Sequence, residues 1–183
     1  MTYSVSAYAV DLNQLIGAIG SRDKELAARV KENSAWRIES YDDPTVLGRA
    51  IDRLIDGEVD NPGGDVQAHD LAYALECVAS LLAGGEIGAS NALKSIAGQW
   101  LYEQPVLKDL VGGSLGPLEG KIPYPDDFPG IRIIPLEELR ARMDAIRGVN
   151  KTEDRNLRNA YFDYMQFIET ASLDKRSLII FYY

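Results

Sequence analysis

The residues best suited to acid–base chemistry lie on one predicted helix, residues 66–85. The chain has a single histidine, His69. A helix advances about 100° per residue, so Tyr73, Glu76 and Ser80 lie on the same predicted face as His69. A carboxylate beside an imidazole could serve general acid–base catalysis, with the tyrosine or serine as a donor. The alternative is an ordinary solvated face, because residues seven apart align on every helix. An apolar stripe is predicted on the opposite side, at Leu71, Leu75, Val78 and Leu82.

Metal and phosphate chemistry have little support in the sequence. Tight zinc sites use Cys and His, and the chain has one of each, His69 and Cys77. The loop GEVDNPGGD (57–65) lacks the D-x-D-x-D-G order of a calcium loop. The glycine-rich stretch 84–90 lacks the GK[ST] of a phosphate loop. The stretch GGSLG (112–116) has the G-x-S-x-G spacing of a hydrolase, but we expect turn glycines there, because the chain offers a single histidine for a triad. We therefore expect no metal site and no cofactor.

The negative charge is concentrated in one part of the sequence. The net charge is −9, and the stretch from Glu39 to Glu86 holds eleven acids against two bases, Arg49 and Arg53. Such a block argues against nucleic acid as a partner, because phosphates need clustered Lys and Arg. It could steer a basic protein, or it could only aid solubility. The acids that we predict to bind a partner are Asp52, Asp56, Glu58, Asp60 and Asp65.

A stretch rich in glycine and proline, residues 112–130, is a second candidate site. Long irregular segments in compact domains are often functional. Its aromatic residues, Tyr124 and Phe128, could line a pocket or anchor an interface. They could equally fasten the loop onto the core.

Three predicted strands and a larger number of helices must position these residues. Strands are predicted at 3–10, 131–134 and 177–183, and residues 36–43 read as irregular or as a brief strand. Helices are predicted at 12–20, 22–33, 44–56, 66–85, 90–104, 105–113, 136–148 and 153–171, with Asp11, Ser21, Asp43, Asp65, Ser90 and Thr152 as caps. The segment SLIIFYY (177–183) is apolar without alternation, which favours a core strand covered on both faces. The alternative is an exposed strand that a partner covers. We predict an α+β fold, a predominantly helical single domain over residues 1–183.

The two ends of the sequence resemble the YfbM-like family of bacterial proteins (domain of unknown function 1877). YSVSAYAVDLNQLIGAIG (3–20) reads as an early strand and a short helix, and NAYFDYMQFIETASLDKRSLIIFYY (159–183) as an aromatic helix and a hydrophobic strand. The resemblance implies a compact bacterial cytoplasmic domain. It implies no activity, because that family is itself uncharacterised.

Together these patterns favour a binding protein over an enzyme. We expect a cytoplasmic protein, since the N-terminal stretch lacks a basic signal region and no apolar run approaches the length of a membrane span. The leading hypothesis is a non-enzymatic module, similar to an immunity protein or antitoxin, that recognises a basic protein through its acidic surface. The alternative is a small-ligand-binding protein or enzyme with a pocket near residues 112–130. A homodimer through the apolar C-terminal region is a third hypothesis.

Overall fold

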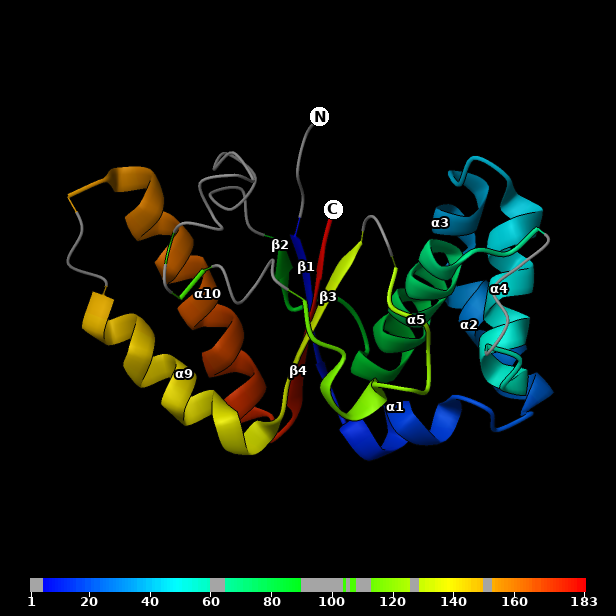
Figure 1. The fold of residues 1–183 in the computed structure, drawn as a ribbon, viewed down its shortest axis with the longest axis horizontal. Coiled ribbons are helices and arrows are strands. Elements are labelled where there is room, and N and C mark those ends of the chain that lie inside the picture. The colour runs from blue at the N-terminus through cyan, green and yellow to red at the C-terminus, as the bar shows by residue number, and fades with distance from the viewer. Residues whose placement is uncertain are drawn as a thin grey trace. The chain divides into compact units, whose positions relative to one another are not determined.

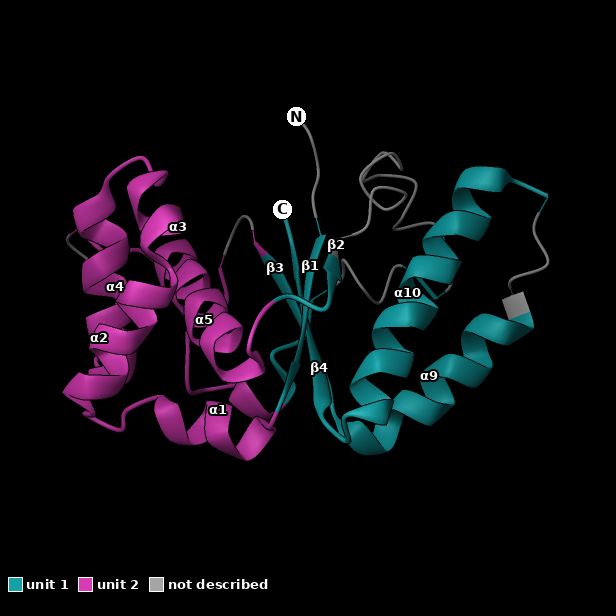
Figure 2. Cartoon of the chain, turned by 180° about the vertical axis from the view of Figure 1, so that it is seen from behind, with its two compact units in different colours: residues 1–10, 86–116, 130–183 teal, residues 11–85, 117–129 magenta. Residues whose placement is uncertain are grey.

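The chain forms two compact units, each built from separated stretches of sequence (Figure 2). The structure, a computed structural model, describes residues 5–59, 65–89, 104, 106–107, 113–125, 129–149 and 153–183. Unit 1 comprises Met1–Val10, Glu86–Gly116 and Gly130–Tyr183, and unit 2 comprises Asp11–Gly85 and Pro117–Pro129. The single domain expected over residues 1–183 stays a prediction, because two compact units within one chain are compatible with it.

Unit 1 is built around a small antiparallel sheet with the strand order β2-β1-β4-β3 (Figure 1). Strand β4 lies in the middle and pairs with β1 on one side and β3 on the other. The strands are β1 (Val5–Val10), β2 (Gly88–Ala89), β3 (Gly130–Ile134) and β4 (Ser177–Tyr182). The predicted sheet of N-terminal, middle and C-terminal strands is confirmed, and so is the α+β class. The two-residue β2, which pairs with Ser6 and Ala7, was not predicted.

Every residue of β4 is buried. Successive side chains of a strand point to opposite faces of the sheet, so both faces of β4 are shielded from water. The continuous apolar run of SLIIFY serves this purpose, and the prediction of a core strand is confirmed. The alternative of an exposed strand is wrong for β4.

Two helices complete the described part of unit 1. Helix α10 (Arg155–Leu173) contacts β1 and β4, and helix α9 (Leu136–Val149) contacts α10 and β4. Helix α10 begins at Asp154, whose side chain accepts from the backbone N–H groups of Asn156 and Leu157 at 2.8 and 3.1 Å. The predicted cap, Thr152, lies outside the described residues.

Unit 2 is helical, and its helices begin at caps that were only partly predicted. They are α1 (Leu12–Ala18), α2 (Lys24–Asn33), α3 (Ala35–Glu39), α4 (Pro44–Asp56) and α5 (Ala68–Ala83). Asp11 and Asp43 cap α1 and α4 as predicted. The prediction of Ser21 as the cap of α2 is wrong: Asp23 accepts from the Leu26 N–H at 2.9 Å, since an ionised carboxylate is the stronger acceptor.

Two further predictions for unit 2 need correction. Residues 36–43 were predicted to be irregular or a brief strand, but α3 occupies the first half of this stretch. The N-cap of helix α5 is Gln67 and not Asp65, because Gln67 and Asp70 form a reciprocal capping box. The helices predicted at 90–104 and 105–113 lie almost entirely outside the described residues. Within the described ranges, no helix has the length and apolarity to cross a membrane.

Helix α4 ends at a close approach between two backbone segments of unit 2. The last carbonyls of a helix lack the regular donors four residues further on. The Gly20 N–H donates to the Leu54 carbonyl at 3.0 Å, and the Arg22 N–H donates to that of Ile55 at 2.8 Å. Gly57 takes the left-handed conformation, φ +79°, and a Cβ there would lie 3.0 Å from the Gly20 Cα. Only glycine meets both requirements without strain.

We predict opposite effects for two glycine substitutions in this helix. Gly57→Ala should destabilise the protein by about 1–2 kcal/mol, the penalty of a left-handed non-glycine residue. Gly48→Ala is the matched control, because Gly48 lies within α4 with nothing near its added Cβ. It should stabilise the protein by about 0.5–1 kcal/mol. Urea unfolding measures both, and shifts of the same sign would contradict the assignment.

Candidate functional site

The predicted partner-binding acids lie mostly in ion pairs within unit 2. Asp52 pairs with Lys31 at 2.7 Å, Asp56 with Lys24 at 2.6 Å, and Asp65 with Arg49 at 2.8 Å. The hydrogen bond from Lys24 to Asp56 raises the pKa of the lysine above its ordinary value. Glu58 is exposed, and Asp60 lies outside the described residues. The local negative charge is therefore smaller than the sequence count suggests, since three of these acids have basic neighbours.

The three residues of the predicted polar site, His69, Tyr73 and Glu76, differ in their exposure to solvent. The His69 side chain is 47% exposed, Tyr73 is half-buried, and Glu76 is fully buried. The prediction of a solvated face is therefore wrong at Glu76. The helical wheel identified the face correctly, but it carries no information about which other element covers that face.

Glu76 forms an ion pair with Arg37 of α3. The arginine side chain is only 18% exposed, so both charges have lost most of their hydration. A buried charge is tolerated only when it is paired and hydrogen-bonded. The pair therefore fixes α3 against α5, and Glu76 is committed to that role instead of to His69.

A second buried carboxylate, Asp70, is the residue that actually adjoins His69. Its Oδ1 accepts from the Tyr41 hydroxyl at 2.5 Å and lies 3.3 Å from His69 Nε2, and its Oδ2 accepts from the Gln67 N–H at 2.7 Å. Tyr41 and Tyr73 meet edge to face, with ring centroids 5.2 Å apart. Sequence reasoning missed Asp70 and Tyr41. The spacing of Gln67 and Asp70 as a capping box was the available signal.

Burial decides the protonation of two other groups in this region. Desolvation, followed by the hydrogen bond to Asp70, raises the pKa of Tyr41 well above its ordinary value. Burial likewise raises the pKa of the Cys77 thiol, and a hydrogen bond with Ser34 opposes the shift. Both groups are neutral at physiological pH. Cys77 is consequently a poor nucleophile, because the thiolate is the reactive form.

The described side chains offer little to a metal ion. Across the part of the chain that the structure describes, no three His, Cys, Asp or Glu residues lie close enough together to hold one. Asp70, which lies 3.3 Å from His69, and Glu76, the sequence neighbour of Cys77, are already bound by Tyr41 and Arg37.

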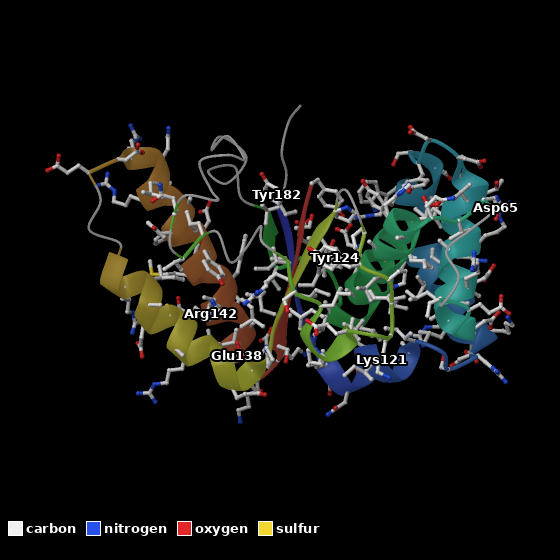
Figure 3. All side chains as sticks on the ribbon, in the orientation of Figure 1. Asp65, Lys121, Tyr124, Glu138, Arg142 and Tyr182 are labelled. Carbon is white, nitrogen blue, oxygen red and sulfur yellow. The ribbon has the colours of Figure 1, made fainter. Side chains whose placement is uncertain are left out.

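The second candidate segment, residues 112–130, contributes apolar residues to the interior. Leu115, Leu118 and Ile122 are buried, whereas Tyr124 is 47% exposed (Figure 3). Phe128 lies outside the described residues. Because these three aliphatic side chains are buried, the segment is better described as fastened to the core than as the lining of an open pocket.

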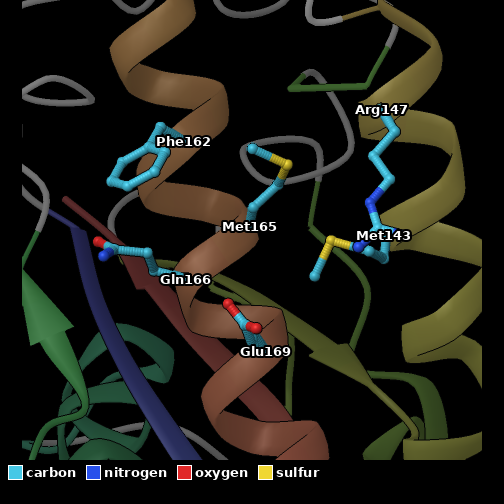
Figure 4. A pocket seen from close by; sticks show the side chains of 6 residues that line it. All are labelled: Met143, Arg147, Phe162, Met165, Gln166 and Glu169. Atoms are coloured by element: carbon cyan, nitrogen blue, oxygen red, sulfur yellow. The ribbon is translucent and has the colours of Figure 1, made fainter.

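A groove that the sequence did not predict lies between α9 and α10 in unit 1 (Figure 4). Its volume is 420 Å³. The lining residues are Met143, Arg147, Phe162, Met165, Gln166 and Glu169. Phe162 is 53% exposed, which is unusual for a large aromatic side chain. Beside the groove, Arg142 and Glu138 form an ion pair along α9 at 3.8 Å (Figure 3). The sequence signal was present: both methionines after Met1 are in this lining.

Fold and candidate sites define a mainly helical α+β protein with a small antiparallel sheet. A family model described as Domain of unknown function (DUF7691) matches residues 1–183, and the chain belongs to this family. No curated protein and no solved structure matches it significantly.

The family match overturns the resemblance to the YfbM-like family (domain of unknown function 1877), because the matching family is a different one and covers the whole chain. That resemblance depended on the apolar character of the two ends. A core strand and an amphipathic helix need such residues in many unrelated folds.

We predict that the buried pair of Arg37 and Glu76 is costly to break on one side only. Glu76→Ala should destabilise the protein by about 3–5 kcal/mol, because it leaves Arg37 charged and poorly hydrated. The double variant Arg37→Met, Glu76→Leu should recover most of this loss. His69→Ala is the control at the same helix and should change stability by less than about 0.5 kcal/mol. A double variant that loses as much stability as Glu76→Ala, or more, would contradict the pairing.

We also predict that Tyr41 makes stability depend on alkaline pH. The phenol is more acidic in the unfolded chain, where its pKa is near 10, than in the folded protein. Above about pH 10 the unfolded state therefore loses a proton that the folded state keeps, and stability falls. Tyr41→Phe should cost about 1.5 kcal/mol near pH 7, and its deficit relative to wild type should shrink above pH 10. Tyr124→Phe, at an exposed position, should follow wild type. A deficit that is constant with pH would count against the Tyr41–Asp70 bond.

Proposed function

We propose that the protein is a non-enzymatic cytoplasmic module that binds a basic protein through the acidic surface of unit 2. The supporting observation is the division of charge between the units. Unit 2 holds 17 acids and eight bases, a net charge of −9, whereas unit 1 holds eleven of each. A field of one sign accelerates the encounter with a partner of the opposite sign.

The ion pairs of unit 2 do not remove this excess. They occupy the bases Lys24, Lys31, Arg37 and Arg49, and each base offsets one acid. Further carboxylates of unit 2 are exposed, at Glu25, Glu32, Glu39, Asp42 and Glu58. The binding surface in this proposal is therefore broader than the five acids taken from the sequence. A role like that of an immunity protein or antitoxin fits this chemistry.

The proposal assigns no enzymatic role because the candidate catalytic groups are already engaged within the fold. Asp70 and Glu76, the buried carboxylates on the helix that carries His69, are held by Tyr41 and Arg37. A general base must be free to receive a proton from the substrate, and these groups are occupied by contacts that stabilise the fold. The buried thiol of Cys77 is uncharged for the reason given above.

The test is capture from a lysate of the source cells, followed by measurement of the association rate. We expect wild type to capture a basic protein. The variant Asp52→Asn, Asp56→Asn, Glu58→Gln should capture much less of it. The unit 1 variant Glu137→Gln, Glu153→Gln, Asp174→Asn changes the net charge equally at exposed positions and should behave as wild type. Equal loss in both variants would assign the effect to net charge and not to unit 2.

Salt dependence provides the second measurement. The association rate of wild type with the captured protein should fall about tenfold or more between low and high ionic strength, as for electrostatically steered complexes. A rate that does not change with salt would falsify electrostatic steering by unit 2.

A further inference from the structure

The groove between α9 and α10 has an apolar centre and charged ends. Met143 and Met165 form the centre, and Phe162 extends the apolar surface toward one end. Methionine side chains are flexible and adapt to many surfaces, and a contiguous exposed apolar patch on a soluble domain typically marks an interaction site. Figure 1 shows that the two helices meet where α9 begins and α10 ends, and diverge toward their other ends.

The two charges lie toward opposite ends of the groove. In Figure 4, Arg147 of α9 lies at the same end as Phe162, Met165 lies in the middle, and Glu169 lies at the other end. Both charged residues are exposed. Arg147 has an acidic neighbour one turn away, Asp144, at 3.8 Å, and an exposed pair at this distance contributes little. Both side chains can therefore reorient toward a partner.

We propose that this groove is the self-association surface of the protein and that its occupant is the same groove of a second copy. In a twofold dimer each residue pair occurs twice, once in each direction. An axis through the centre, near Met165, places the Arg147 end of one copy against the Glu169 end of the other.

Charge complementarity selects this occupant. The groove has one basic end, one acidic end and an apolar middle. When a second copy is turned end to end, its acidic end faces the basic end of the first copy, and its basic end faces the acidic end. A helix of another protein would carry the same charge pattern only by coincidence, whereas a second copy of this chain always carries it.

This inference is independent of the proposed function. It concerns unit 1, whereas the proposed recognition of a basic protein concerns unit 2. The sequence suggested a homodimer through the apolar C-terminal region, and this proposal uses the groove beside α10 instead of strand β4, because β4 is buried.

The test is sedimentation velocity over a wide range of concentration, with two charge reversals. We expect wild type to dimerise as the concentration rises. Arg147→Glu and Glu169→Arg should each raise the dimer dissociation constant about tenfold or more, because each creates two like-charge pairs. An equimolar mixture of the two variants should form a heterodimer, since every pair is then of opposite charge. This rescue requires residue 147 of one copy to lie against residue 169 of the other, and a species that stops at the mass of a dimer identifies the closed twofold arrangement.

Two further variants serve as controls. Glu137→Arg reverses an exposed charge on α9 outside the groove lining and should leave the dimer unchanged. Phe162→Asp places a charge on the apolar surface of the groove and should give a monomer with an unchanged far-ultraviolet spectrum, because Phe162 is already half-exposed. Wild type that stays monomeric at all concentrations overturns the proposal. So does a dimer that survives both reversals, or a mixture that remains monomeric.

Discussion

The pairing of β1 with β4 is the constraint on which unit 1 depends. It joins residues from the two ends of the chain, from Val5 opposite Tyr182 to Val10 opposite Ser177. The other strands extend this pair, β3 on β4 and β2 on β1. Helices α9 and α10 pack on the same strands. The entropic cost of closing so long a loop rises only slowly with loop length. The burial of every residue of β4 offsets this cost.

The two units differ in how local their contacts are. Most of unit 2 is one continuous stretch, Asp11–Gly85, and its helices pack on near neighbours in sequence. Unit 1 needs contacts between residues about 170 positions apart, such as the bond from Arg176 to the Ala9 carbonyl. Non-local contacts form slowly. Unit 2 therefore has the features of an early folding element, and unit 1 those of a late one.

Local signals explain which parts of the fold were predictable. Asp43 followed by Pro44 defines a helix start in two residues, and SLIIFYY defines a core strand by its own composition. Burial of Glu76 could not be predicted in this way, because it depends on Arg37, which lies on another helix. The pairing of Asp52 and Asp56 with lysines of α2 has the same cause. The groove arises from the separation of α9 and α10, a quantity that neither helix encodes alone. The family resemblance taken from the sequence was wrong, because apolar residues near both ends of a chain are common to many folds.

The register of β1 and β4 has a consequence for the topology of the chain. The two strands are antiparallel neighbours, and the start of one lies opposite the end of the other. They are thus related as the two arms of a β-hairpin without its turn. A short glycine-containing linker of the hairpin type between residues 183 and 5 would close the chain into a ring without moving either strand. The same fold could then be opened at a surface connection elsewhere, as a circular permutant in which the slowest contact to form has become the most local one.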